Sequence, residues 1–326
     1  MELARQAIGS ESRPAIEVSV VIPIYNEAEN INPLHDRLAQ TLDGLGRSAE
    51  VWYVNDGSTD NSLDLLRRLA ERDARVGVIE LSRNSGQHAA VLAGFAACQG
   101  QIIVTLDGDL QNPPEEIPRL VSKLEEGYQV VGGWRETRHD PWLRRAASAV
   151  VNRATSIAVG VHMHDYGCML RAYRREVIDE ILECNERSLF IPALANTVAR
   201  RTTEIEVAHA GRGAGTSKYK PMKLINLAFD LITGFSLIPI HLVSLTGILV
   251  ALAGLAFGVF LFVRRLFVGP ESEGVFTLFA ILFVFLGVLI LAVGLLGEYV
   301  GRIYLEVRRR PPYRVKAVYR RDEESR

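Results

Sequence analysis

Two carboxylates one residue apart are the clearest chemical signal in the sequence. Asp107 and Asp109 flank a glycine directly after the apolar run IIVTL, and Gln111 follows at the same spacing. Oxygen ligands at the end of one strand can hold a hard divalent cation, Mg²⁺ or Mn²⁺, which usually also binds substrate phosphates. The alternative is that the two acids only cap the helix that Pro113 opens. Their position after a buried strand favours the metal site.

The pattern of apolar residues predicts the scaffold that holds these carboxylates. Short β-branched runs alternate with segments of helical apolar spacing, which predicts an α/β fold with an open, mostly parallel sheet and flanking helices. Ligands bind such sheets at the carboxyl ends of the strands. Polar turns follow the predicted strands at residues 25–27, 55–58, 82–84 and 107–109. The predicted strands are residues 17–24, 50–54, 76–81 and 102–106, and the predicted helices are residues 28–45, 62–72, 87–98 and 113–127.

Two later stretches, residues 235–263 and 275–297, contain no Asp, Glu, Lys or Arg. A helix of ~23 residues is ~35 Å long, which exceeds the ~30 Å hydrocarbon core of a bilayer. Both stretches are therefore predicted to cross a membrane. Eight basic residues against two acids in residues 298–321 place this tail in the cytoplasm by the positive-inside rule, with the short linker between the helices outside.

These features divide the chain into five parts. A cytoplasmic domain over residues 1–220 precedes an amphipathic segment over residues 221–240, for which an interfacial helix and a plain linker helix are both open. The two membrane helices and a basic cytoplasmic tail over residues 298–326 follow.

Charge and cysteine content exclude other classes. Lys and Arg total 37 and Asp and Glu total 38, a net charge of −1 that argues against a nucleic-acid-binding protein. The three cysteines are far apart and form no C-x-x-C pair, which argues against a disulfide scaffold or a structural zinc site.

Four motifs occur in a fixed order: P-x-Y-N-E at residues 23–27, N-D-G-S at 55–58, R-N-x-G-Q at 83–87 and D-x-D-L-Q at 107–111. This order resembles the nucleotide-sugar-binding half of family-2 glycosyltransferases with the GT-A fold. The two apolar C-terminal stretches narrow the resemblance to polyprenyl-phosphate glycosyltransferases, which are related to dolichol-phosphate mannose synthase. The runs QHAAVLAGF, DYGCMLRAYRR and LLGEYVGRIY resemble bacterial members that act in lipid A modification.

The resemblance implies an enzyme that transfers a sugar from a UDP-sugar to undecaprenyl phosphate with inversion. The expected sugar is 4-deoxy-4-formamido-L-arabinose, and the expected role is lipid A modification and polymyxin resistance. It also implies a multi-pass protein of the bacterial inner membrane and a homo-oligomer such as a tetramer. The alternatives are a polyprenyl-phosphate glucosyl- or mannosyltransferase that uses UDP-glucose or GDP-mannose, and a non-catalytic nucleotide-binding membrane scaffold.

The resemblance further implies roles for individual residues. The metal ligands would be Asp107, Asp109 and Gln111, and the catalytic residues Asp107, Asp109 and Arg212. The residues that bind the nucleotide sugar would be Pro23, Tyr25, Glu27, Asp56, Gly86, Gln87, Ser217 and Lys218. The acceptor phosphate would be held by Arg144, Ser148 and Arg135.

Several of these residues have simpler interpretations. Arg144 could belong to a charge pair that faces solvent or membrane, and Lys218 could meet anionic lipid headgroups. His88, next to Gln87, is predicted to be structural, and Asp165 could face the acceptor.

Overall fold

The computed structural model describes residues 16–134, 164, 167–184, 190–208, 238–268, 275–307 and 311–321. The chain forms two compact units. The first unit comprises Met1–Ala228 together with Arg310–Arg326, and the second comprises Phe229–Arg309.

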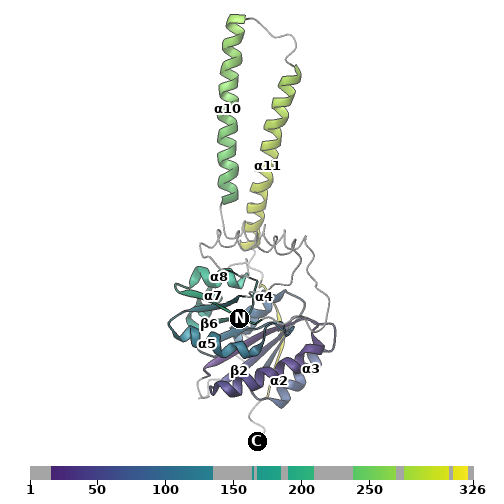
Figure 1. Ribbon diagram of the computed structural model, residues 1–326. Helices are drawn as coiled ribbons and strands as arrows, with labels where there is room; N and C mark the ends of the chain where they lie inside the picture. The colour runs from purple at the N-terminus through teal and green to yellow at the C-terminus, as the bar shows by residue number, and fades with distance from the viewer. Residues whose placement is uncertain are drawn as a thin grey trace. The chain divides into compact units, whose positions relative to one another are not determined.

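The described part of the first unit is built on an eight-stranded mixed sheet in the order β7-β5-β6-β4-β1-β2-β3-β8. Figure 1 labels β2 and β6 of this sheet among the helices that flank it. Its central strands β3, β2, β1 and β4 run parallel, whereas β6 and β8 run antiparallel to their neighbours β4 and β3. The predicted mostly parallel α/β sheet is therefore confirmed. The strands are β1 (Val18–Ile24), β2 (Ala49–Asn55), β3 (Val76–Leu81), β4 (Ile102–Thr105), β5 (Val130–Trp134), β6 (Arg171–Arg174), β7 (Thr202–Glu206) and β8 (Val315–Arg320).

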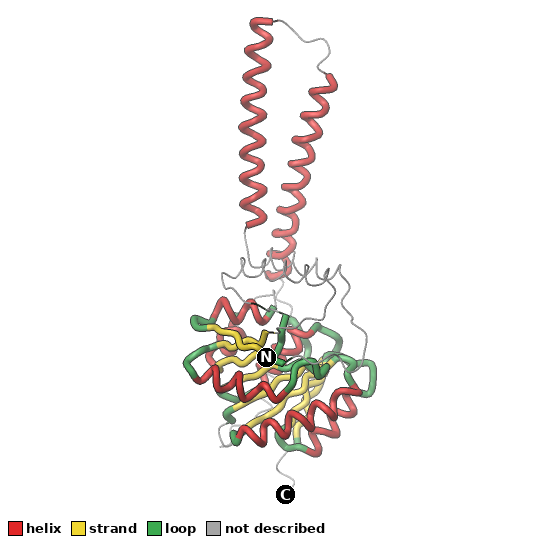
Figure 2. Tube along the Cα trace, in the orientation of Figure 1, coloured by secondary structure: helices red, strands yellow, loops and turns green. Residues whose placement is uncertain are grey.

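Helices cover both faces of this sheet, as Figure 2 shows. Alternate residues of β1 point to opposite faces. Val20 and Ile22 belong to the core under α2, α3 and α5, whereas Val21 belongs to the core under α4, α7 and α8. The helices of the first face are α2 (Ala28–Leu45), α3 (Ser62–Arg72) and α5 (Ile117–Glu125), the last preceded by the 3₁₀ turn η1 (Pro114–Glu116). Those of the second face are α4 (Gln87–Ala97), α7 (Arg175–Glu183) and α8 (Ile191–Val198).

Strand β8 lies at one edge of the sheet, although it comes from the end of the chain. It pairs antiparallel with β3. Lys316 Nζ donates to Glu80 Oε1 at 2.6 Å, and the Tyr319 hydroxyl donates to Glu80 Oε2 at 2.7 Å. The Glu80 side chain is only 6% exposed, and burial raises its pKa. The hydrogen bonds from Lys316 and Tyr319 outweigh that rise, so the net pKa of Glu80 is lowered.

A second acid receives a cation from the same strand. Arg320 Nη1 of β8 lies 3.3 Å from Oε2 of Glu50, a residue of β2 that is almost fully buried. Sequence analysis assigned these last residues only to a basic tail. In the run VKAVYR the basic residues Lys316 and Arg320 are four positions apart, so they lie on one face of the strand. Charged side chains suit an edge strand because they discourage pairing with other molecules.

The described second unit consists of two long helices, α10 (Ile238–Val268) and α11 (Val275–Val307). Each contains a window long and apolar enough to cross a membrane: Leu242–Phe260 with mean hydropathy 2.3 and Val284–Gly301 with mean hydropathy 2.1. Nothing in either window is buried within the protein. These are the two apolar C-terminal helices that the sequence predicted, and α11 runs ten residues past the predicted end at residue 297.

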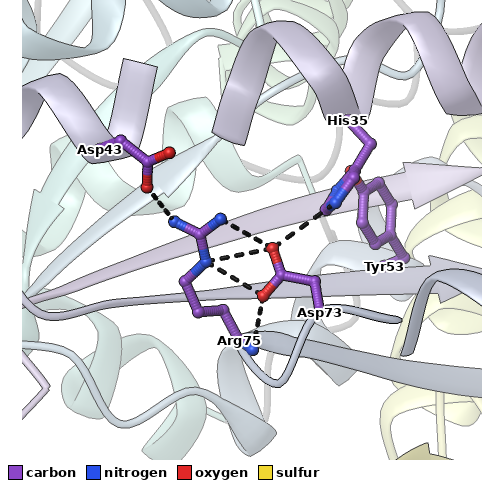
Figure 3. Close-up of polar contacts among 5 residues, drawn as sticks. All are labelled: His35, Asp43, Tyr53, Asp73 and Arg75. Carbon is purple, nitrogen blue, oxygen red and sulfur yellow. Dashed lines mark hydrogen bonds and ion pairs between the residues drawn. The ribbon is translucent and has the colours of Figure 1, made fainter. Parts of the chain in front are cut away.

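A polar network that is buried at His35 and Tyr53 and exposed at Asp43 joins α2, β2 and the turn before β3 (Figure 3). His35 Nδ1 lies 3.2 Å from the Tyr53 hydroxyl, and His35 Nε2 lies 3.6 Å from Asp73 Oδ2. Arg75 Nη2 donates to Asp73 at 2.7 Å, and Arg75 Nη1 donates to Asp43 at 2.7 Å. Burial lowers the pKa of His35, and the opposing effect of Asp73 does not restore it.

This lowered pKa makes the stability of the domain depend on pH. The unfolded chain, with a histidine pKa of about 6.5, binds more protons than the folded one just below that pH. The stability that neutral His35 contributes is therefore complete above about pH 6.5 and is lost as the pH falls through the folded-state pKa.

We expect the unfolding temperature to fall less between pH 7 and pH 5 in a His35→Gln variant than in wild type. Circular dichroism in detergent measures it, and equal falls would contradict this role.

The contacts of β8 predict a second effect on stability. Lys316→Glu places a carboxylate against Glu80, so the unfolding temperature should drop because two like charges then meet at a largely buried site. Lys316→Gln removes the cation without adding a carboxylate, so it is the control and should lower the unfolding temperature less. Thermal unfolding checks both variants. A fall in Lys316→Gln as large as in Lys316→Glu would contradict the repulsion that we expect at Glu80.

Candidate active site

The polar turns of the first unit meet at one edge of the sheet. Strands β1, β2, β3 and β4 are parallel and adjacent, so their carboxyl ends lie side by side. The loops after these strands contain the four motifs found in the sequence. This edge is therefore the candidate active site.

The loop after β2 is fastened to the loop after β3 by Asp56. This residue is 3% exposed. Its Oδ1 accepts from the backbone N–H of Ser85 at 2.6 Å, and its Oδ2 accepts from that of Gly86 at 2.9 Å. Burial raises the pKa of Asp56, and the two backbone bonds only partly oppose that rise. A carboxylate has about four lone-pair sites, so each oxygen keeps capacity to accept from a ligand as well.

Gly57 permits the same two loops to approach each other. Its φ is +68°, in the left-handed region that favours glycine. A Cβ at this position would lie 2.6 Å from the backbone nitrogen of Asn84 and 2.7 Å from the carbonyl carbon of Arg83. Because these are backbone atoms, they cannot move aside as the end of a flexible side chain can. A larger residue at position 57 would therefore push the two loops apart.

The turn after β1 is tied to the N-D-G-S loop. Asn26 has φ +54°. Its Oδ1 accepts from the backbone N–H of Thr59 at 2.8 Å, and its own N–H donates to Ser58 Oγ at 3.1 Å. The residue before α2 is held by the start of α3, because the Glu27 N–H donates to Ser62 Oγ at 3.1 Å. Contacts between loops thus fix where Tyr25 and Glu27 lie.

Two amide side chains hold Asp107, the first carboxylate of the D-x-D turn. Gln87 Nε2, at the start of α4, donates to Asp107 Oδ1 at 2.6 Å. Asn112 Nδ2 donates to Asp107 Oδ2 at 3.0 Å. Asp109 Oδ1 accepts from the backbone N–H of Gln111 at 3.2 Å. The predicted residues Gln87, Asp107, Asp109 and Gln111 are therefore neighbours in the structure.

The D-x-D turn has an unusual backbone. Leu110 has φ +61°, a conformation that costs a non-glycine residue about 1–2 kcal/mol. Leu110 packs against the core under α2 and α5, and this burial offsets the strain. Gly108 lies close to the end of β1, since a Cβ there would meet Ile24 Cδ1 at 2.6 Å. The turn is therefore held from both sides.

The donor set fits a hard divalent cation. Asp107 and Asp109 present carboxylate oxygens from one turn and are half-buried, so a ligand can reach them. Within the described ranges, no group of three or more His, Cys, Asp or Glu side chains forms a complete metal cage. Two protein carboxylates leave coordination positions for water and for substrate phosphates, which is the usual arrangement for Mg²⁺.

The other predicted residues divide into two groups. Pro23, Tyr25, Glu27, Asp56 and Gly86 lie in or beside the turns of this edge, and Tyr25 is 37% exposed there. The second group lies outside the described residues: Arg135, Arg144, Ser148, Asp165, Arg212, Ser217 and Lys218. Sequence analysis missed Asn112 and Ser85, whose only signal was their place within the motif segments.

Residues 19–182 match the family model for glycosyl transferase family 2. The chain therefore belongs to this family, as the order of its four motifs predicted. Within this family, the chain is similar to proteins that are named undecaprenyl-phosphate 4-deoxy-4-formamido-L-arabinose transferase. The relative from Serratia proteamaculans (strain 568) is 53% identical over 312 residues, which cover 95% of this chain and 96% of that protein. The relative from Edwardsiella ictaluri (strain 93-146) is 52% identical over 94% of this chain and 95% of its own.

One solved structure is a more distant match. Glucosyl-3-phosphoglycerate synthase from Mycobacterium tuberculosis, in complex with Mn²⁺, uridine diphosphate and phosphoglyceric acid, has a TM-score of 0.49 and 19% identity. The match covers 67% of this chain and 77% of that chain. A similarity this distant transfers no property of that enzyme.

The paired carboxylates predict a strong effect of one substitution. Asp109→Asn keeps the size of the side chain but removes a charged oxygen, so sugar transfer should fall about 100-fold or more because leaving-group charge is less well stabilised. The unfolding temperature should stay near that of wild type. Asp64→Asn, which changes an exposed acid on α3, is the matched control and should keep full activity. Turnover near wild type in Asp109→Asn would refute the metal assignment.

Proposed function

We propose that this protein transfers 4-deoxy-4-formamido-L-arabinose from its UDP derivative to undecaprenyl phosphate, as a step in lipid A modification and polymyxin resistance. The observation that carries the proposal is the identity of 52–53% to transferases of that name over 94–95% of this chain. The intact D-x-D turn, with both carboxylates at the carboxyl edge of the sheet, supports catalysis rather than a binding role alone.

A divalent cation, Mg²⁺ or Mn²⁺, would be held by Asp107, Asp109 and Gln111 and would neutralise the diphosphate leaving group. Gln87 and Asn112 hold the Asp107 carboxylate in place before any ligand binds. Arg212 would add positive charge beside the same diphosphate, where negative charge develops in the transition state.

The nucleotide would lie along the turns after β1 and β2. Pro23, Tyr25 and Glu27 would border its base and ribose, and Asp56 would accept from the uracil N–H. Gly86 and Gln87 begin α4 beside it, and Ser217 and Lys218 would bind donor phosphates. The Asp56 carboxylate already fixes the neighbouring loop, so its position is set in advance of binding.

The acceptor is a phosphate that needs no general base. A phosphomonoester has a second pKa near 6, so it is largely dianionic at about pH 7. Direct attack on the anomeric carbon inverts its configuration. Arg144 and Ser148, with Arg135, would hold this phosphate by charge-assisted hydrogen bonds and reduce its repulsion from the donor.

The connectivity of the chain supports the membrane topology. Met1–Ala228 and the strand β8 that follows α11 belong to one sheet-containing unit, in which β8 pairs with β3. If α10 crosses a membrane, α11 must cross it in return. The basic residues that follow α11 favour the cytoplasmic side. We therefore place the enzyme in the bacterial inner membrane with its catalytic domain in the cytoplasm. We also propose that it is a homo-oligomer, such as a tetramer.

A donor comparison tests the function. Purified protein in detergent is incubated with undecaprenyl phosphate and labelled UDP-4-deoxy-4-formamido-L-arabinose, and the extracted lipid is analysed. We expect labelled lipid with this donor and much less with UDP-glucose or GDP-mannose. UDP should raise the unfolding temperature more than GDP does, because Asp56 accepts from uracil. Better transfer from UDP-glucose would keep the enzyme class and reject the sugar, whereas nucleotide binding without any transfer would favour a scaffold.

A further inference from the structure

His88 lies at the active-site end of a buried helix face. It is the second residue of α4, and Leu92 and Phe95, four and seven positions later, pack into the core under α4. Helix α4 follows β3, so its first turn lies at the carboxyl edge of the sheet. The preceding residue, Gln87, donates to Asp107 of the D-x-D turn. The imidazole of His88 therefore lies at the end of the buried face of α4 that is nearest the carboxyl edge of the sheet.

The ring of His88 is packed, and no described residue forms a hydrogen bond with it. It meets Phe190 edge-on, with ring centroids 5.1 Å apart and planes at 75°. Its Nδ1 is buried and has no hydrogen-bond partner among the described residues. The side chain has intermediate exposure. Nε2, unlike Nδ1, is not among the buried side-chain atoms that lack a partner, so Nε2 is the ring nitrogen that a ligand can reach. A buried donor left unpaired costs about 1–3 kcal/mol, which favours the ring proton on Nε2 rather than on Nδ1.

A buried cation lies close enough to His88 to affect its pKa. Arg171 of β6 is fully buried, and its Nε donates to the Cys168 carbonyl at 2.9 Å. It stands opposite Thr105 in the pairing of β6 with β4, two residues before Asp107. Burial, and then the charge of Arg171, lowers the pKa of His88 to about 4. The imidazole is therefore neutral near pH 7, with one N–H and one lone pair.

We propose that Nε2 of His88 donates a hydrogen bond to an oxygen of the nucleotide-sugar donor. The ligand at this edge would be a sugar diphosphate, whose phosphate oxygens only accept, so a neutral ring must present its N–H to them. The donor is favoured over the lipid acceptor because Gln87 links this turn of α4 to the metal-binding carboxylate. The assignment of a donor substrate rests on the proposed function.

Four substitutions at this position separate a hydrogen bond from simple packing. Gln can place its amide nitrogen near Nε2, whereas Asn can place its nitrogen only near Nδ1. Phe keeps the ring against Phe190 and removes both nitrogens, and Ala removes ring and nitrogens together. All four are made in the full-length protein, and their unfolding temperatures without ligand show which ones fold.

The expected result is a change in the KM for the donor. His88→Phe, His88→Asn and His88→Ala should raise the KM for UDP-4-deoxy-4-formamido-L-arabinose roughly tenfold, the loss of one hydrogen bond of ordinary strength. His88→Gln should stay within about threefold of wild type. The KM for undecaprenyl phosphate should be unchanged in all of them. A wild-type donor KM in His88→Phe, a better rescue by Asn than by Gln, or a rise in the acceptor KM instead would overturn the proposal.

A binding measurement without lipid keeps this inference separate from the transfer reaction. The rise in unfolding temperature caused by UDP and by the UDP-sugar is compared in wild type and His88→Phe. A smaller rise with both ligands places the contact on the diphosphate, and a smaller rise with the UDP-sugar alone places it on the sugar. Equal rises in the two proteins would refute the contact. If wild type binds UDP but transfers no sugar, the proposed function fails while this comparison still decides the role of His88.

Discussion

The buried carboxylate of Asp56 is the link on which the geometry of the site depends. It draws the backbone of Ser85 and Gly86 against the loop after β2. Gly86 is the residue from which α4 starts, and the next residue, Gln87, holds Asp107. A single acid at the end of β2 thereby helps to position the D-x-D turn at the end of β4, two strands away. The strand order β4-β1-β2-β3 makes this possible, because it brings all four carboxyl ends to one edge.

Two non-glycine residues in the left-handed region mark the same edge. Asn26 and Leu110 follow the strands β1 and β4, which are neighbours in the sheet. Each is held by contacts from outside its own turn, Asn26 by Thr59 and Leu110 by the hydrophobic core. Strained conformations persist where the surroundings determine them from several sides. The polar side chains of the site are thus ordered by the scaffold before substrate arrives, which is what electrostatic stabilisation of a leaving group requires.

Local patterns in the sequence predicted local structure well. Helices α2 and α3 and strand β3 begin and end where the spacing of their apolar residues placed them. The D-x-D turn and the other motifs were found because they directly follow buried strands. Contacts between distant segments could not be predicted in this way. The hydrogen bond from Glu27 to Ser62, the packing of His88 on Phe190 and the pairing of β8 with β3 each depend on a partner that no short window of sequence contains.

The pairing of β8 with β3 has a consequence for biosynthesis. Lys316 and Glu80 are 236 residues apart in the chain. At a translation rate of about 5–20 residues per second, β3 waits on the order of 10–50 s for its neighbour. During that time its edge is open, and the acids Glu80 and Glu50 lack the cations that β8 brings. Both apolar helices leave the ribosome within this interval. The sheet therefore reaches its complete form only after both apolar helices have been synthesised, so the catalytic domain is completed later than the helix pair that interrupts it.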